Sequence, residues 1–456
     1  MIKLTDRTKK IIKIITIAIF AIYVFSICLT WLMTIDYNLA PDERMKMPVC
    51  EFLVKNGTLP HGGDESIRDP IWGISYAFTP ILSYMFSAVF MKILSFFTQN
   101  GTYMLWAARF VSVLCLTGYA IMCYKIGEKL FKGAYKWLFA VFATLLPQVV
   151  FLGSYLNNDT LALLSISIIV YSWITGLEKN WDWRSCITLA IGIGICALSY
   201  YNAYGYLLCS IIIYIASCYI KKINIKEFFK KGIAIALIAF AIGGWWFVRN
   251  YILYDGDFIG LNVSREYGEM YAQEPYKPSN RTTPANTGKS LTNMLFDMKW
   301  IQTTFNSFVG LFGNMHVKMD PYMYTSYSVV FIIGLIGLVL EVIISIIKKI
   351  KNKEEIEDKE KIKKKEKILF NIIMGICLII PIILSIYYSY FNDFQPQGRY
   401  IMPMIIPFMY FIVTGYKRIF NIIKNKKIRN IILGIIILIW SIAPIYIYFE
   451  YIKKFL

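Results

Sequence analysis

Histidine is almost absent from this sequence, whose 456 residues include only His61 and His316. Their wide separation argues against a histidine-based metal centre. Cysteine occurs nine times, but only Cys50 lies in a polar segment, and the others lie in or at the edge of apolar runs. This distribution predicts neither a disulfide framework nor a cysteine metal site. A glycine-rich nucleotide-binding motif and internal repeats are also lacking.

Charge is scarce over long stretches of the chain. Residues 187–220 contain no Asp, Glu, Lys or Arg, 57% of all residues are hydrophobic, and the mean hydropathy is +0.52. Runs of about 20 apolar residues are typical of transmembrane helices. We therefore predict an all-α polytopic membrane protein, forming one domain over 1–456, with about 11 spans at 12–34, 105–124, 137–153, 160–177, 187–200, 203–220, 232–249, 325–347, 369–390, 400–416 and 430–448.

The net charge of +19 would suggest a nucleic-acid partner for a soluble protein. Here the basic residues gather in short gaps between apolar runs, which indicates membrane orientation instead, and we predict no nucleic-acid partner. If the apolar stretch 74–97 lies on the membrane surface without crossing, every basic gap falls on the side of the basic N-terminus. The N-terminus is then cytoplasmic and the C-terminus extracytoplasmic, in the cell membrane.

This topology assigns three large connections. A first external loop, 35–104, contains the juxtamembrane helices, and a long external loop covers 250–324. The long loop has several prolines and is predicted to act as a lid or acceptor guide, with an amphipathic helix at 291–314. The segment 348–368 is predicted to be a basic cytoplasmic loop that can contact anionic lipid headgroups.

Polar residues recur at the external ends of the predicted spans. Asp42 and Glu43 follow the first span, and Asn158 and Asp159 form the tip between the third and fourth. The remaining candidates are Arg249, Arg399 and Tyr400. Arginine offers a planar donor fork suited to phosphate. Carboxylates and arginines at one lipid–water boundary fit the transfer of a group from a lipid phosphate to a hydroxyl.

The order of these motifs resembles the GT-C superfamily of membrane glycosyltransferases. The segment APDERMKMPVCEFLVKNGTLP is similar to the acid-pair loop of protein O-mannosyltransferases and aminoarabinose transferases. PQVVFLGSYLNNDTLALL resembles their second acidic loop. WWFVRNYILYDGDFIG, FNSFVGLFGN and QPQGRYIMPMIIP resemble a bacterial branch of predicted GT-C membrane proteins.

The resemblance implies an inverting glycosyltransferase that uses a polyprenyl-phosphate sugar, with a lipid, protein or cell-wall glycan as acceptor. It implies Asp42 as the catalytic base and Glu43 as its acidic partner. Asp159 matches an acid that in some members orients the acceptor or helps Asp42 to bind a divalent metal, Mg²⁺ or Mn²⁺. Arg249 and Arg399 would be phosphate ligands. From the sequence we expect no counterpart of the large C-terminal periplasmic domain that some relatives have.

Simpler interpretations of the same residues remain open. Acids at a helix start are favoured by the helix dipole, and Asp159 is a typical capping residue. Arg249 can extend to the interface, and Tyr400 can belong to an aromatic belt. The alternative functions are a lipid-linked glycan transporter or flippase and a non-enzymatic envelope assembly protein. A transporter would have polar residues throughout the bundle and broken helices in matching halves.

Overall fold

The computed structural model describes residues 5–351 and 358–456 and is almost entirely helical. Long apolar runs form its long helices, and α1, α4, α10 and α16 begin after polar capping residues, namely Thr5, Asn100, Asn224 and Asn425. The helices are α1 (Asp6–Thr34), α2 (Glu43–Asn56), α3 (Leu82–Ser95), α4 (Gly101–Leu130), α5 (Tyr135–Thr144), α6 (Pro147–Leu152), α7 (Asp159–Lys179), α8 (Trp183–Ala197), α9 (Gly205–Ile220), α10 (Ile225–Leu253), α11 (Leu261–Tyr271), α12 (Trp300–Gly310), α13 (Pro321–Lys351), α14 (Asp358–Phe391), α15 (Ile405–Phe420), α16 (Lys426–Ile447) and α17 (Lys453–Phe455).

Short elements connect these helices. They are η1 (Glu65–Ile67), η2 (Tyr76–Phe78), η3 (Tyr201–Ala203), η4 (Glu274–Tyr276), η5 (Asn293–Asp297), η6 (Gly398–Met404) and η7 (Tyr448–Ile452), of which η5 and η7 are π-helical. The strands β1 (Leu311–Phe312) and β2 (Val317–Lys318) pair antiparallel. The amphipathic helix predicted at 291–314 is shorter than expected. Its main helix, α12, begins only at Trp300, because Lys299 directly before it adopts a left-handed conformation.

Nine helices of the described residues are long and apolar enough to cross a membrane. They correspond to nine of the predicted spans, so the protein is a multi-pass membrane protein. The predicted span 137–153 is divided into α5 and α6, because Pro147 forces Leu146 into an extended conformation. The predicted span 187–200 forms the 15-residue α8, which packs between α7 and α10.

Two of the predicted connections are largely helical. The stretch 74–97, predicted to form a helix on the membrane surface, contains η2 and the 14-residue α3, which is shorter than the roughly 20 residues of a typical span. The predicted basic loop 348–368 is mostly an extension of α13 and α14, and its residues 352–357 lie outside the described residues. Within the bundle, α13 and α15 pack very closely, since a Cβ added to Gly337 would lie 2.2 Å from the Gly415 carbonyl oxygen.

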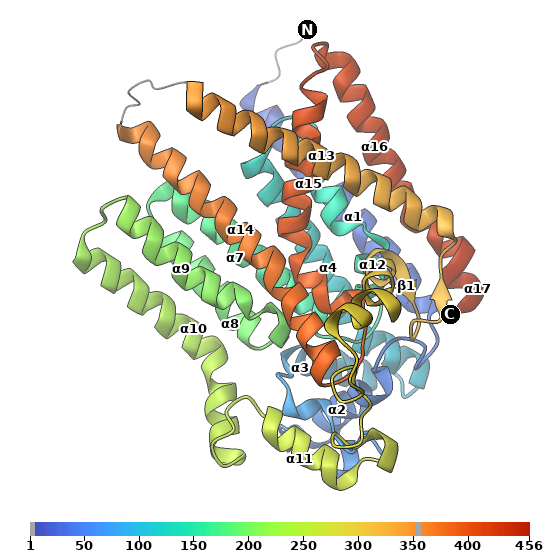
Figure 1. The fold of residues 1–456 in the computed structure, drawn as a ribbon. Coiled ribbons are helices and arrows are strands. Elements are labelled where there is room, and N and C mark those ends of the chain that lie inside the picture. The colour runs from blue at the N-terminus through green and yellow to red at the C-terminus, as the bar shows by residue number, and fades with distance from the viewer. Residues whose placement is uncertain (1–4, 352–357) are drawn as a thin grey trace.

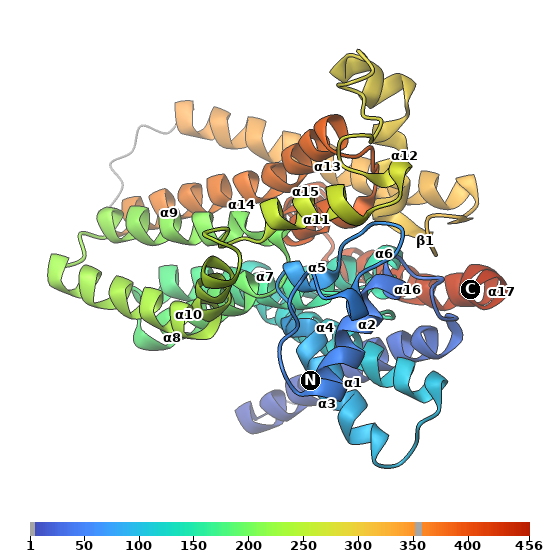
Figure 2. The same ribbon diagram turned by 90° about the horizontal axis from the view of Figure 1, so that it is seen from below.

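The bundle has two chemically different ends. We call the end formed by α2, η2, η6 and the start of α7 the site face, and the end formed by the α9–α10 turn and the start of α14 the basic face. Figure 1 shows α2, α3 and α11 at the lower end, with the α9–α10 turn at the left. In Figure 2, seen from below, α2 and α11 lie in front of the long helices. The C-terminus is tied to the site face, because the Leu456 carbonyl accepts a hydrogen bond from Asp36 N (2.8 Å).

Candidate functional site

Asp42 lies at the point where the chain turns from α1 into α2. It is the N-cap residue of α2 and has a left-handed backbone conformation (φ 59°), which Asp and Asn tolerate better than most residues. Its carbonyl accepts hydrogen bonds from Met45 N (3.0 Å) and Lys46 N (3.1 Å). Its carboxylate does not cap the helix, and 29% of its side chain stays exposed. The backbone therefore fixes Asp42 and leaves its carboxylate accessible.

Arg399 reaches Asp42 from the other end of the chain. Its Nη2 donates to Asp42 Oδ2 at 2.6 Å, and its guanidinium lies 5.1 Å from the centre of the Tyr400 ring. The preceding Gly398 allows this approach, since a Cβ there would lie 2.0 Å from Phe308 N. Arg399 Nε is buried and has no hydrogen-bond partner among the described residues. The guanidinium thus retains an unused donor beside Asp42.

Lys46 is a third charged member of the cluster, which sequence reasoning missed. Only 1% of its side chain is exposed. Its Nζ donates to the Pro41 carbonyl (2.8 Å) and lies 3.8 Å from Asp42 Oδ2. The ammonium lies 5.3 Å and 5.4 Å from the ring centres of Tyr76 and Tyr155, where aromatic faces stabilise a cation. Its position four residues after Asp42 places both side chains on one face of α2.

The charges in this cluster shift the pKa values of Asp42 and Lys46. Burial alone would raise the pKa of Asp42, but the Arg399 and Lys46 charges outweigh burial and hold it well below its usual value. Burial lowers the pKa of Lys46 to about 8, against the opposing effect of Asp42 and Asp159. Asp42 is therefore a carboxylate at neutral pH, and Lys46 titrates close to that range.

Asp159 opens α7 beside the same cluster. It is buried with 7% exposure, and its electrostatic neighbours are Arg399, Lys46 and Asp42. The first turn of α7 is capped by Asn157, whose Oδ1 accepts from Thr160 N (3.1 Å), so Asp159 is not the capping side chain. Asn158 is used structurally, since its Nδ2 donates to the Ser199 carbonyl (3.0 Å).

Glu43 lies next to Asp42 in sequence but points into the protein. Both Glu43 and Arg109, which comes from α4, have fully buried side chains. Arg109 Nε and Nη2 donate to the two carboxylate oxygens at 2.8 Å and 2.6 Å. The remaining donors of Arg109 bind the Leu32, Ile35 and Asp36 carbonyls. Glu43 therefore holds the end of α1, α2 and α4 together, and its carboxylate is not accessible to a substrate.

The last two predicted residues differ in their relation to the cluster. Tyr400 belongs to it, because its hydroxyl accepts from Arg399 Nη2 (3.3 Å) and donates to Gln395 Oε1. Arg249 lies apart. Its guanidinium donates to the Pro60 carbonyl (2.6 Å) and to Asn250 Oδ1 (3.1 Å), and it has no ion pair with Asp42 or Asp159 among the described residues.

The cluster does not fit a divalent metal well. Asp42 is already paired with Arg399, and Lys46 adds a second positive charge beside it. The described residues contain no group of three or more His, Cys, Asp or Glu side chains arranged to hold a metal ion. Two carboxylates next to two cations suit a ligand anion better than Mg²⁺ or Mn²⁺.

Residues 60–409 match the model of a family described as predicted membrane proteins (DUF2142). The chain belongs to this family. The matched region of the DUF2142 member includes Arg109, Asp159 and Arg399, whereas Asp42 and Lys46 precede it. No curated protein matches the chain.

Solved structures resemble the DUF2142 protein in fold. The Archaeoglobus fulgidus oligosaccharyltransferase, solved with a tethered acceptor peptide, is 12% identical with a TM-score of 0.50, over 93% of this chain and 54% of that one. ArnT from Cupriavidus metallidurans bound to undecaprenyl phosphate is 11% identical with a TM-score of 0.48, over 87% and 60%. The chain thus spans little more than half the length of these proteins. The predicted GT-C fold is confirmed.

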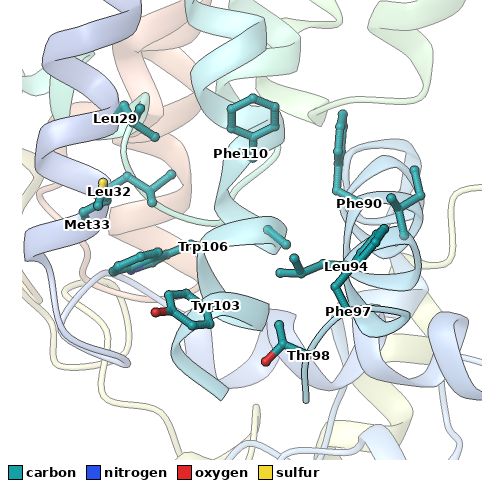
Figure 3. Close-up of a pocket in the computed structure, with 12 residues that line it drawn as sticks. Leu29, Leu32, Met33, Phe90, Leu94, Phe97, Thr98, Tyr103, Trp106 and Phe110 are labelled. Atoms are coloured by element: carbon teal, nitrogen blue, oxygen red, sulfur yellow. The ribbon is translucent and has the colours of Figure 1, made fainter. Parts of the chain in front are cut away.

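An apolar groove of about 590 Å³ lies between α1, α3 and α4 of the DUF2142 protein, outside the charged cluster. Figure 3 shows Trp106 of α4 beside Leu32 and Met33, with Phe90, Leu94 and Phe97 on the other side of α4. None of the predicted site residues lines this groove. A groove of this composition is expected in lipid, so it does not locate the chemistry.

Proposed function

We propose that this protein is an inverting membrane glycosyltransferase. It would move a sugar from a polyprenyl-phosphate donor to an acceptor hydroxyl of a lipid, a protein or a cell-wall glycan. The supporting observation is the contact between Asp42 and Arg399, with Lys46 and Asp159 beside it. A base, a phosphate-binding cation and a second acid are the groups that this transfer needs at one place.

The reaction would be a single displacement. The acceptor hydroxyl gives its proton to Asp42, its oxygen bonds to the anomeric carbon, and the bond from that carbon to the donor phosphate oxygen breaks. The polyprenyl phosphate leaves with the electron pair. Arg399 and Lys46 stabilise the developing negative charge, and Asp159 orients the acceptor. Attack on the face opposite the leaving group inverts the anomeric carbon.

The low pKa of Asp42 requires a change before it can accept a proton well. A carboxylate held by Arg399 and Lys46 is a weak base. A donor phosphate would compete with Asp42 for the Arg399 guanidinium, whose Nε has no partner in the part of the chain that the structure describes. Transfer of Arg399 to the phosphate would raise the pKa of Asp42 and strengthen it as a base. Donor binding would thus activate the acid beside it.

The same proposal assigns sidedness and supporting roles. The site face would be extracytoplasmic and the basic face cytoplasmic, as positive-inside statistics indicate. Glu43 and Arg109 would act as positioning residues, since their pair anchors the turn that carries Asp42. The long connection 250–324 contains α11 and α12, and we propose that it guides the acceptor. No step is assigned to a metal.

The test is replacement of Asp42 by asparagine in membranes supplied with a panel of polyprenyl-phosphate sugars. Asparagine keeps the size of the side chain and tolerates the left-handed backbone, so the fold should persist. Release of polyprenyl phosphate should fall by about 10²–10⁴-fold, the usual contribution of a positioned base. Asp36→Asn is the matched control, because Asp36 is an exposed acid of the same connection.

Retention of transfer by Asp42→Asn at the level of Asp36→Asn would contradict the proposed mechanism. A transporter would respond differently, because it would move the lipid-linked glycan across the membrane without releasing polyprenyl phosphate. An assembly protein would tolerate both substitutions. Release of the lipid phosphate therefore separates the enzyme from the two alternative functions.

A further inference from the structure

A cavity of about 920 Å³ lies at the basic face, at the opposite end of the bundle from Asp42. It is an open cavity lined by the ends of α4, α7 and α9, the starts of α10 and α14, and Tyr410 of α15. Figure 1 shows α9, α10 and α14 side by side at this end of the molecule. Five lysines and three glutamates line it, namely Lys129, Lys221, Lys231, Lys363, Lys367, Glu178, Glu227 and Glu366.

Each of the three glutamates already has a lysine partner. Glu366 Oε1 lies 2.8 Å from Lys221 Nζ, and Lys221 also donates to Asn180 Oδ1 (2.7 Å). Only 9% of the Lys221 side chain is exposed, so this pair is a built part of the wall. The other two contacts join Glu178 to Lys129 (2.5 Å) and Glu227 to Lys231 (3.5 Å). Lysines of the same cavity lining therefore neutralise the three carboxylates.

Lys363 and Lys367 are the two remaining lysines of the cavity lining. Neither has a carboxylate partner among the described residues, and they are four residues apart on α14. This spacing places them on one face of the helix, with Phe370 one turn further on. Across the cavity, α10 begins after Asn224, whose side chain accepts a hydrogen bond from Lys226 N, and the start of the helix adds a positive potential. The cavity lining thus has an excess of positive charge.

Apart from Asn180 and Asn224, the rest of the lining is mostly apolar. It consists of Leu130, Ile174, Leu177, Ile223, Ile362, Phe370 and Tyr410. A free anion would use the lysines and leave this surface unfilled. A cavity of this size, lined by both lysines and apolar side chains, matches a molecule with an anionic head and a hydrocarbon chain.

We propose that this cavity binds an anionic phospholipid of the adjoining leaflet. Its phosphodiester would contact Lys363 and Lys367, and the first part of an acyl chain would lie along the apolar wall. The lipid would join α14 to the α9–α10 turn, segments that are far apart in sequence. This inference does not depend on the proposed transfer reaction, because it uses no residue of the site face.

The test measures phospholipid binding to the full-length protein in detergent by native mass spectrometry. Phosphatidylglycerol is compared with phosphatidylcholine and with glycerophosphoglycerol, which has the same headgroup without acyl chains. Tight retention of phosphatidylglycerol alone is the expected result. Equal retention of phosphatidylcholine, or equal binding of the deacylated headgroup, would overturn the proposal.

Two double variants locate the site. Lys363→Gln with Lys367→Gln should weaken phosphatidylglycerol binding roughly 25-fold, since each lysine near an anionic headgroup contributes about fivefold. Lys361→Gln with Lys364→Gln is the matched control, because these lysines are exposed on the same helix but do not line the cavity. An equal loss in both variants would mean nonspecific attraction to a basic surface and would overturn the proposal. All four lysines are exposed, so unfolding is not expected, and size-exclusion chromatography checks this.

Discussion

Two arginine–carboxylate pairs lie side by side at the site face, and they have opposite designs. The Glu43–Arg109 pair is fully buried, and its hydrogen bonds go to protein atoms. The Asp42–Arg399 pair is partly open, and one buried donor of Arg399 has no partner within residues 5–351 and 358–456. The adjacent acids thus differ in their surroundings: Glu43 closes a structural joint, and Asp42 is the acid that we propose faces a ligand. Among the described residues, the donors of Arg109 bind protein acceptors, whereas Arg399 Nε remains available to bind a substrate.

The largest effect is expected from breaking the buried pair. Glu43→Leu or Arg109→Leu leaves the other charge buried and uncompensated, which typically costs about 3–5 kcal/mol of unfolding free energy. The double replacement should recover part of this loss, because no isolated charge remains. Denaturant unfolding in detergent measures all three. Single variants as stable as the wild type would show that the pair is not a structural joint.

Arg399→Gln should give the reverse pattern. Transfer should fall by about 10²–10³-fold, the range found when a donor to a developing negative charge is removed. The unfolding free energy should fall by less than in Arg109→Leu, because the Asp42 carboxylate is 29% exposed and keeps Lys46 beside it. Assays of polyprenyl-phosphate release and of unfolding, made on the same preparation, give both values. A stability loss as large as that of Arg109→Leu would remove the distinction between the pairs.

Lys46 predicts how the open pair depends on pH. Its pKa is lowered to about 8, so its charge is lost as the pH rises through that value. Transfer that depends on this charge should decline about tenfold per pH unit above 8. Unfolded lysine keeps its proton to about pH 10.5, so stability should increase over the same range and activity should fall without unfolding. Lys46→Arg keeps its charge, and a folded variant with the same decline would contradict this assignment.

The smallest effect is expected at Arg249, the one arginine among the predicted site residues that belongs to neither pair. It bonds to Pro60 and Asn250, so Arg249→Gln removes contacts worth about 1 kcal/mol of stability. Transfer should change by less than about threefold, since well under 1 kcal/mol of the barrier is involved. The rate of polyprenyl-phosphate release by Arg249→Gln and by the wild type measures this change. A loss comparable to Arg399→Gln would bring Arg249 into the site.

Local sequence patterns predicted the helices well and failed where the chain bends within an apolar run. Hydropathy cannot show that Leu146 is extended, although the following Pro147 is a known signal for such a break. The run at 400–416 is another case, because η6 begins the segment as a 3₁₀ helix that contains Pro403. That irregular turn is what directs Arg399 toward Asp42.

The site was predicted in part. The acid at position 42, the second acid at 159 and Arg399 come together, but their pairing across the chain has no local pattern. The sequence does indicate that Arg109 has a buried partner, since an arginine within the predicted span 105–124 is costly unless it is paired. The sequence indicates less about Lys46, because a lysine four residues after an acid usually forms a solvated ion pair on a helix surface. Only the tertiary structure shows that it is buried.

The two pairs also differ in how much chain separates their members. The Glu43–Arg109 contact joins residues 66 positions apart, and the Asp42–Arg399 contact joins residues 357 positions apart. A chain that emerges from its N-terminus can close the first contact once α4 has entered the membrane. The second must wait for η6, near the end of synthesis. The joint is thus assembled long before the ligand-facing pair, and a nascent chain carries a finished support for Asp42 while it is still without Arg399.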